Sequence, residues 1–425
     1  MSKPFLQRKL VRIALLLLAL FILLQFFRPS LDNPPVTGDL KAPPEVKAVL
    51  KRACYDCHSN ETDLKWFDKP MPAYALVVSH IRDGRRLLNF SNWDSLTPAQ
   101  QKGRLFESLN QIVFREMPLS QYTAFHHEAR ISLDDIATLR NYLSTLAYQP
   151  HPDTARQQAA NTQYYAWITA ETAGAASGSG STAGANAATD SVLPEYNGIE
   201  YPKDYREWQP ISTTERWDNG TLRVILGNPT AITAIKEGNT NPWPDGTAFA
   251  KLAWDQNLDT TGGASTVKAG EFKQVEFMFK DKEKYASTNG WGFGRWLGAK
   301  LKPYGRNRFF ASECVHCHQP MEPFDYVFTM PINTEKYIPG DYKLITSGVE
   351  KKSGHMYTLY GNDIALAAAR KGQPYPKDAA LTLATWSRKD DFHWYGGNIP
   401  DSLLSVEKIS PDSITHHPRA SVIPR

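Results

Sequence analysis

The chain has 425 residues, enough for two or three domains, and a formal net charge of only +4 at pH 7. It has no long basic run beyond its N-terminus and no acidic tract, which argues against a nucleic-acid-binding protein. Aromatic residues make up 12% of the chain, and its 29 prolines and 27 glycines indicate many turns.

The N-terminus joins basic residues to an apolar run over residues 13–27. The basic residues are Lys3, Arg8, Lys9 and Arg12. We predict a transmembrane anchor over residues 11–27, because about 20 apolar residues span a bilayer and no small-x-small cleavage site follows. Residues 1–10 would then stay cytoplasmic, which gives a single-pass protein of the bacterial inner membrane with its soluble domains in the periplasm. A cleaved signal peptide is the alternative.

All four cysteines fall in two pentads with the pattern C-x-x-C-H. The thiol and imidazole residues are Cys54, Cys57 and His58 in the first pentad, and Cys314, Cys317 and His318 in the second. This pattern is the attachment signal for c-type haem, in which both thiols bond the porphyrin and the histidine binds iron. A single zinc site would need ligands from distant parts of the chain, and a thioredoxin-like pair needs no histidine. We therefore predict two covalently bound c-type haems.

Residues 28–150 have the pattern of a small helical domain. Apolar residues recur at helical spacing over residues 73–88, 98–114 and 133–146, and Ser132 can cap the last of these helices. The result is an all-α, cytochrome c-like domain around the first pentad.

The predicted sixth ligand of the first haem iron is Met117, which precedes a proline. A soft thioether favours ferrous iron, so ligation by His58 and Met117 suits electron transfer. A methionine can also simply pack in a core. The other candidate ligands are Met71, His80, His126 and His127.

Residues from about 33 to 148 resemble the haem-binding domain family of bacterial membrane-anchored cytochromes. The resemblance rests on residues 54–61 and 88–93 and on the late Met-Pro step at Met117. It implies a haem domain that accepts and donates electrons.

Residues 151–192 separate two regions of different composition. A helix is expected over residues 156–170, and the Ala/Gly/Ser-rich stretch 171–190 is predicted to be a flexible linker. Beyond it, residues 193–333 predict a mostly antiparallel sheet. The expected strands are residues 222–226, 247–254, 272–279 and 291–296, with helices near 229–235 and at the second pentad.

Residues 201–208, 222–229 and 245–251, together with the second pentad, resemble the cytochrome P-460 family. The family is similar in fold to cytochrome c′-β, a mostly antiparallel domain that usually dimerises. The resemblance implies a c-type haem with an open distal face, and a small ligand such as hydroxylamine or nitric oxide.

Two residues take a role from this resemblance. Lys251 stands where hydroxylamine-oxidising members bond a lysine to the porphyrin edge, and strand alternation puts it on one face with Phe249 and Ala253. Its alternative is a solvent-facing strand lysine. Arg223 matches a distal arginine that would hydrogen-bond a bound nitrogen oxide, or it is an ordinary strand arginine. Both are therefore candidate catalytic residues.

Residues 334–425 hold a partial repeat of this domain. Residues 373–386 align without gaps on residues 241–254, with Leu383 in place of Lys251 and no later cysteine. We predict a haem-free copy that packs on the first as an internal pseudo-dimer, in place of a homodimer. Because the aligned stretch ends early, this copy is expected to need strands from elsewhere.

The predicted fold class is multidomain α + β, with a transmembrane helix, an all-α haem domain, a β domain and its partial repeat. The predicted function is a dihaem cytochrome that binds or oxidises hydroxylamine or nitric oxide and passes electrons to a periplasmic or membrane redox partner. The alternative is a cytochrome that only transfers electrons or binds nitric oxide. Arg308, Phe309 and Phe310 lie just before the second pentad, and a phenylalanine cap there would favour binding of small gases over oxidation.

Overall fold

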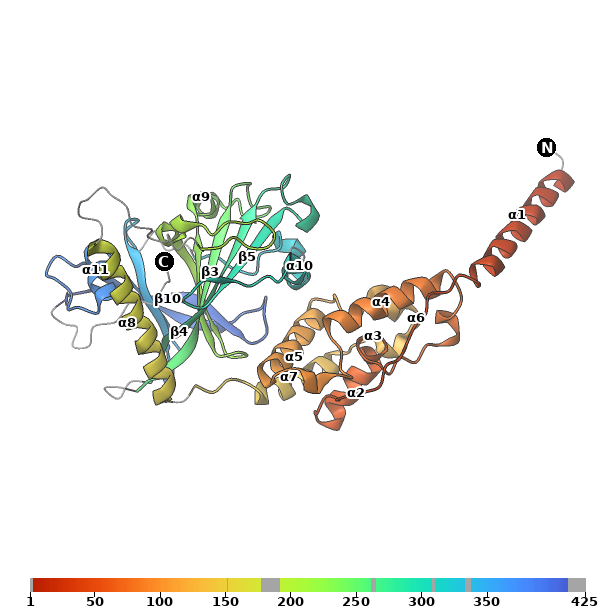
Figure 1. Cartoon of the computed structure of the whole chain (residues 1–425), viewed down its shortest axis with the longest axis horizontal. Coiled ribbons are helices and arrows are strands. Elements are labelled where there is room, and N and C mark those ends of the chain that lie inside the picture. The colour runs from red at the N-terminus through yellow and green to blue at the C-terminus, as the bar shows by residue number, and fades with distance from the viewer. Residues whose placement is uncertain are drawn as a thin grey trace, which may run out of the picture. The chain divides into compact units, whose positions relative to one another are not determined.

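The computed structural model describes residues 3–150, 152–176, 192–260, 265–307, 310–332 and 338–411. The chain divides into two compact units, Met1–Leu146 and Ala147–Arg425. The first unit is helical and the second is built on an antiparallel sheet (Figure 1). Most of the predicted linker lies in residues 177–191, outside the described residues.

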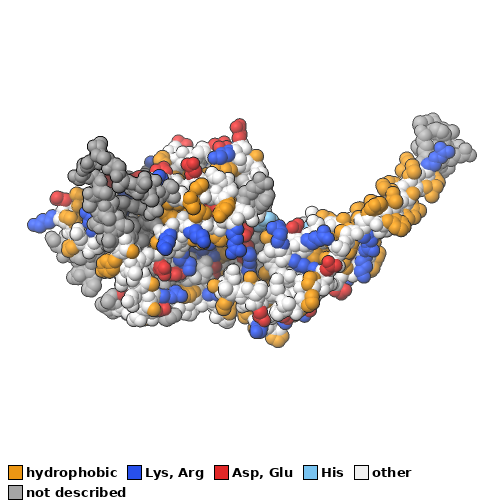
Figure 2. Space-filling view, viewed as in Figure 1, with side chains coloured by type: hydrophobic (Ala, Val, Ile, Leu, Met, Phe, Trp, Pro, Cys, Tyr) orange, Lys and Arg blue, Asp and Glu red, His pale blue; other side chains and the backbone are white. Residues whose placement is uncertain are grey.

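The N-terminal stretch forms α1 (Lys3–Leu24), which exposes apolar side chains over residues 10–23 (Figure 2). Among the described residues, no helix is long and apolar enough to cross a membrane. The apolar run inside α1 is residues 13–24, which at 1.5 Å per residue covers roughly 18 Å of a hydrocarbon core about 30 Å thick. The prediction of a transmembrane helix over residues 11–27, and with it that of a single-pass anchor in the inner membrane, was wrong.

Six α-helices follow in the first unit: α2 (Pro44–Ala53), α3 (Tyr55–His58), α4 (Ala73–Leu87), α5 (Pro98–Val113), α6 (Ser120–Phe125) and α7 (Leu133–Thr145). The three helices expected from apolar spacing are confirmed as α4, α5 and α7. Thr97 and Ser132 cap α5 and α7 by accepting hydrogen bonds from backbone amides of the first turn. The apolar faces of these helices meet in a core that includes Leu50, Ile81 and Phe106.

The second unit begins with α8 (Thr154–Ala176), which is longer than the helix expected over residues 156–170. It lies along β4 (Figure 1). The amide of Gln163 donates to the carbonyl of Phe272 at 3.3 Å and accepts from its N–H at 2.7 Å. This bond pair fixes α8 on the sheet.

The sheet contains two copies of one strand pattern. The first copy is β1 (Gln209–Arg216), β2 (Thr221–Gly227), α9 (Pro229–Glu237), β3 (Ala248–Asp259) and β4 (Thr266–Lys280). The second copy is β7 (Lys343–Glu350), β8 (Met356–Gly361), α11 (Asp363–Lys371), β9 (Leu381–Asp390) and β10 (Gly397–Ile409). Between them lie β5 (Trp291–Leu297), β6 (Lys302–Pro303) and α10 (Ala311–His318). All four predicted strands are confirmed, as β2, β3, β4 and β5.

The two copies use the same local signals at their helices. Asn228 and Asn362 cap α9 and α11 with their side chains, and Gly238 and Gly372 end these helices in the left-handed conformation. The second copy also has its own fourth strand, β10, beyond the stretch that aligns in sequence. Its end strands β10 and β7 pair with β1 and β4 of the first copy, in keeping with the expectation that it needs strands from elsewhere.

The strand order is β3-β2-β1-β10-β9-β8-β7-β4-β5-β6, and β3 also pairs with β4. Eight strands thus close on themselves, while β5 and β6 extend from the C-terminal half of β4. Two pairings join the copies, β1 with β10 and β4 with β7. The copies therefore share one continuous sheet.

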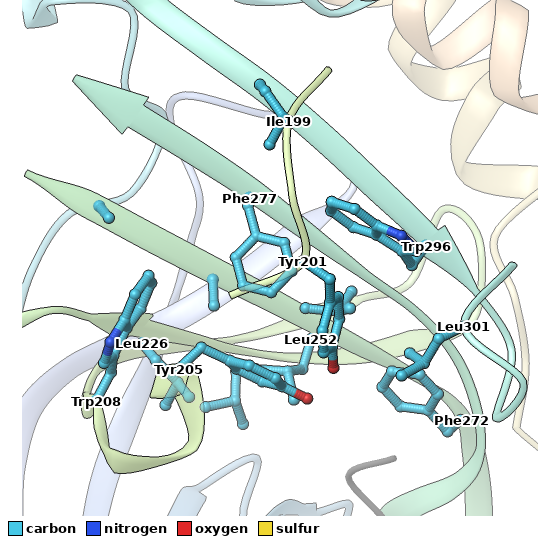
Figure 3. Close-up of a cluster of buried hydrophobic side chains, with 14 of the residues drawn as sticks. Ile199, Tyr201, Tyr205, Trp208, Leu226, Leu252, Phe272, Phe277, Trp296 and Leu301 are labelled. Carbon is cyan, nitrogen blue, oxygen red and sulfur yellow. The ribbon is translucent and has the colours of Figure 1, made fainter. Parts of the chain in front are cut away.

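One face of β2–β5 is filled by large aromatic side chains (Figure 3). The ring of Tyr201 meets those of Phe277 and Trp296 edge-on, at centroid distances of 5.7 and 5.3 Å. These edge-to-face contacts stabilise the sheet beyond the apolar area they bury. The opposite face of the same strands is left for the charged side chains described next.

Candidate functional site

In the first pentad, His58 ends the short helix α3 and lies against α4. Its Nδ1 lies 3.0 Å from the carbonyl oxygen of Gly84 and 3.1 Å from that of Leu88. A nitrogen between two carbonyl oxygens must be the protonated one, so the lone pair of the ring lies on Nε2. Burial lowers the pKa of His58, which keeps the ring neutral, as a metal ligand must be.

The two cysteines of this pentad are partly buried. Burial raises the pKa of Cys54 and of Cys57 to about 12. The backbone at Cys57 lies directly on α4, since a Cβ atom added at Gly84 would be only 2.6 Å from the Cys57 carbonyl oxygen. The first pentad therefore packs against α4 at Gly84, a position where only glycine fits.

The structure separates the candidates for the sixth ligand. Both ring nitrogens of His126 have partners, with Nε2 at 3.1 Å from Asp68 and Nδ1 at 3.2 Å from the carbonyl of Tyr122. This engagement argues against His126 as an iron ligand. Met117 lies half-buried in the turn after α5, where its N–H donates to the Gln111 carbonyl at 3.2 Å. Met117 stays the predicted ligand.

The second pentad lies on α10 and ends in His318. The ring of His318 donates from Nδ1 to the carbonyl oxygen of Tyr326 at 2.7 Å, again leaving the lone pair on Nε2. Burial lowers the pKa of His318 to about 4, and burial raises that of Cys314 to about 12. Both pentads thus present a neutral, oriented histidine beside two cysteine thiols.

A buried ion pair fixes the turn that holds His318. The turn includes Asp325, whose carboxylate lies 2.7 Å from Nζ of Lys280 and accepts the N–H of Trp243 at 2.8 Å. The indole of Trp291 donates to the Asp325 carbonyl at 2.9 Å. Since Tyr326 follows directly, these contacts set the position of the carbonyl that orients His318.

Charged side chains on four neighbouring strands form a row beside α10. In register, Lys251 on β3 lies opposite Glu276 on β4, and Glu276 lies opposite Arg295 on β5. Lys251 forms an ion pair with Glu276, and Nε of Arg295 lies 3.6 Å from the same carboxylate. Arg223 on β2 shares this face, two residues before the neighbour of Lys251 in β2.

These charges act on one another and on α10. Burial lowers the pKa of Lys251, and it lowers that of Arg223 to about 10. Burial alone would raise the pKa of Glu276, but Lys251, Arg295 and Arg223 outweigh it and lower that pKa to about 2. The Lys251 charge also lowers the pKa of His318. The structure therefore brings Lys251 close to the second pentad, whereas Arg223 lies near Lys251 and Glu276 and donates from Nε to the Thr221 hydroxyl at 3.3 Å.

Sequence reasoning missed Glu276 and Arg295. Both lie in segments predicted as strands, but nothing local marks a strand carboxylate that faces a lysine on the neighbouring strand. Only the pairing register of β3, β4 and β5 could have found them. Of the residues before the second pentad, Phe310 is buried, whereas Arg308 and Phe309 lie outside the described residues.

Comparison with known families agrees with this geometry. Residues 19–145 match the haem-binding domain family, and residues 202–329 match the cytochrome P460 family. A comparison with the curated proteins gave no match. Each matched segment contains one pentad, and two thiols beside an oriented neutral histidine fit a haem. The chain is therefore a haem-containing cytochrome that joins a haem-binding domain to a cytochrome P460 domain.

Proposed function

We propose that the chain is a dihaem c-type cytochrome, with one covalently bound haem at each pentad. The first haem would be bonded by Cys54 and Cys57, with His58 on its iron. The second would be bonded by Cys314 and Cys317, with His318 on its iron. The support at both places is a pair of partly buried cysteines and a histidine whose Nδ1 is already engaged by a backbone carbonyl.

At the second haem we propose that hydroxylamine or nitric oxide binds. The observation that carries this proposal is the charged row of Arg223, Lys251, Glu276 and Arg295 beside α10. Three cations facing one carboxylate leave an excess of positive charge in a buried place, which favours an oxygen that becomes negative during reaction. Arg223 would donate a hydrogen bond to that oxygen.

Lys251 would bond the porphyrin edge, as the likeness to the P-460 family implies. When bound, the haem supplies the redox chemistry. Electrons taken from the ligand would pass to the first haem, whose ligation by His58 and Met117 leaves no open position, and from there to an external redox partner. The residues of the chain hold and orient the ligand and neutralise its charge.

A second function, gas binding or electron transfer without catalysis, is favoured by one observation. Lys251 already forms an ion pair with Glu276, so its ammonium has a partner within the protein. The buried ring of Phe310, just before α10, adds apolar surface there. Such a site suits a small neutral gas.

The optical spectrum of a Lys251→Leu variant decides between the two functions. If Lys251 is bonded to the porphyrin, the wild-type ferrous Soret band is strongly red-shifted, and Lys251→Leu loses both this shift and hydroxylamine oxidation but keeps its haem. The matched control is Lys268→Leu, which removes a half-exposed strand lysine paired with Asp259. An ordinary high-spin spectrum, identical in wild type and Lys251→Leu, would leave only the gas-binding or electron-carrying function.

A Gly84→Ala substitution is expected to impair haem attachment at the first pentad. The new methyl group would meet the Cys57 carbonyl at 2.6 Å, and overpacking of this kind lowers stability by about 1–3 kcal/mol. The absorbance of haem per chain, read with the thermal midpoint, measures the effect. Gly103→Ala in α5 is the control, since nothing lies within 4 Å of a Cβ there. Equal haem content in both variants would show that haem attachment at the first pentad does not depend on its close packing against α4.

A further inference from the structure

A line of aromatic rings leads away from His318 and crosses from the first copy to the second. The ring of His318 lies 4.9 Å from that of Phe328, edge to face. Phe328 in turn lies 5.8 Å from Trp394, in the segment between β9 and β10 of the second copy. The haem-free copy therefore contributes a ring one step removed from a predicted iron ligand.

The line continues to the start of the second unit. Trp394 is joined by a peptide bond to Tyr395, whose ring lies 5.3 Å from that of Trp217. The carbonyl of Trp217, in the turn between β1 and β2, accepts the N–H of Tyr148 at 2.6 Å. Tyr148 is the second residue of this unit, and the helical unit ends at Leu146. The contacts thus connect His318 to the point where the haem-binding domain is attached along the chain.

Polar contacts hold the central ring of this line. The indole N–H of Trp394 donates to Asp218 at 3.1 Å, and the guanidinium of Arg216 lies 4.4 Å from the ring centroid. Asp218 and Arg216 form a buried ion pair with each other. In the same segment, His393 donates from Nδ1 to the Phe328 carbonyl at 2.7 Å. His393 and Trp394 are neighbours in the second copy. His393 is hydrogen-bonded to the backbone of Phe328, and Trp394 is fixed by Asp218 and Arg216.

This arrangement differs from the ordinary aromatic core of the sheet. In that core the rings of Tyr205, Phe277 and Trp296 are fully buried and pack on several sides. The rings along the line are only half-buried; they are Phe328, Trp394, Tyr395 and Trp217. A hydrophobic core does not require rings arranged in a line. A continuous path of covalent bonds and packed rings, however, gives stronger electronic coupling between two redox centres than empty space or solvent does.

We propose that Phe328, Trp394, Tyr395 and Trp217 carry electrons from the haem held by His318 toward the haem-binding domain. This inference rests on the proposed dihaem cytochrome. The rings transmit one electron at a time. The iron at His318 is oxidised from ferrous to ferric, and the iron at His58 is reduced from ferric to ferrous. No bond forms or breaks, and no proton moves, within the rings.

The test is the rate of electron transfer between the haems in the full chain loaded with both. One haem is reduced by a light flash, and the absorbance of both haems is followed. Trp394→Leu is expected to slow the transfer several-fold, whereas Trp394→Phe, which keeps an aromatic ring, stays close to wild type. The matched control is Phe392→Leu, two residues away in the same segment and exposed. Haem content, spectra and both reduction potentials should be unchanged in all three.

Transfer at the wild-type rate in Trp394→Leu, with both haems loaded, overturns the route but leaves the dihaem proposal standing. A wild-type chain that carries only one haem, or two haems that exchange no electrons, overturns the proposed function and the route with it. If Trp394→Leu does not fold, Tyr395→Leu against Tyr395→Phe makes the same comparison one ring further along, with the same two readings.

Discussion

Replacing Lys280 by methionine is expected to lower the free energy of unfolding by about 3–5 kcal/mol, the usual effect of removing one partner of a buried ion pair. The Lys280 side chain is only 3% exposed and that of Asp325 only 8%. Methionine fills much of the same space, so the loss comes from a buried carboxylate left without its cation. Urea unfolding followed by tryptophan fluorescence measures the change.

The same substitution is expected to disturb the second haem, because the Asp325 turn carries the Tyr326 carbonyl that orients His318. A changed absorption spectrum of the second haem would show this disturbance. Lys273→Met is the control, since Lys273 is 45% exposed and its pair with Asp255 is a surface ion pair, worth about 0–1 kcal/mol. Equal small losses in both variants would mean that the buried pair does not hold the turn.

Neutralising Glu276 is expected to lower the free energy of unfolding by about 3 kcal/mol at pH 7 while Lys251 carries its ammonium. Burial opposes the charge on Glu276, but Lys251, Arg295 and Arg223 lower its pKa from 4.5 to about 2. A depressed carboxylate pKa stabilises the folded state above pH 4.5, and this contribution is lost as the pH falls toward 2. The gap between wild type and Glu276→Gln should therefore be largest at neutral pH and close below pH 4.5.

The measurement is the unfolding free energy of both chains between pH 7 and pH 2, with Glu237→Gln, at an exposed position of α9, as the control. A gap that stays constant with pH would contradict the assigned charge of Glu276. A lysine bonded to the porphyrin no longer carries an ammonium, so the haem-loaded chain would then show a smaller gap at pH 7. The titration thus also reports on the state of Lys251.

The elements that follow local rules could be predicted from the sequence. The two pentads, the cap at Ser132 and the strands around Lys251 each depend on residues within one turn or one strand. The families matched at residues 19–145 and 202–329 were recognisable from short local motifs for the same reason. The anchor prediction was wrong because the apolar run was counted through Phe27, whereas α1 ends at Leu24.

The rest of the site depends on contacts between distant residues. Glu276 faces Lys251 only through the pairing of β3 with β4, and Lys280 meets Asp325 across a separation of 45 residues. Trp394 reaches Phe328 only because the two copies share a sheet. Register is set along whole strands and by the turns between them, so the residues next to Lys251 or Trp394 in the sequence do not show which distant residue each will meet.

The shared sheet has one further consequence. Its two halves are parts of one polypeptide, so their association does not cost the translational and rotational freedom that separate subunits lose. Dilution, which dissociates an ordinary dimer, therefore does not pull the halves apart. The second half completes the sheet. At the position equivalent to Lys251 it has Leu383, which packs with the apolar cluster that includes residues of α11. The second copy thus uses this position for packing within the shared sheet.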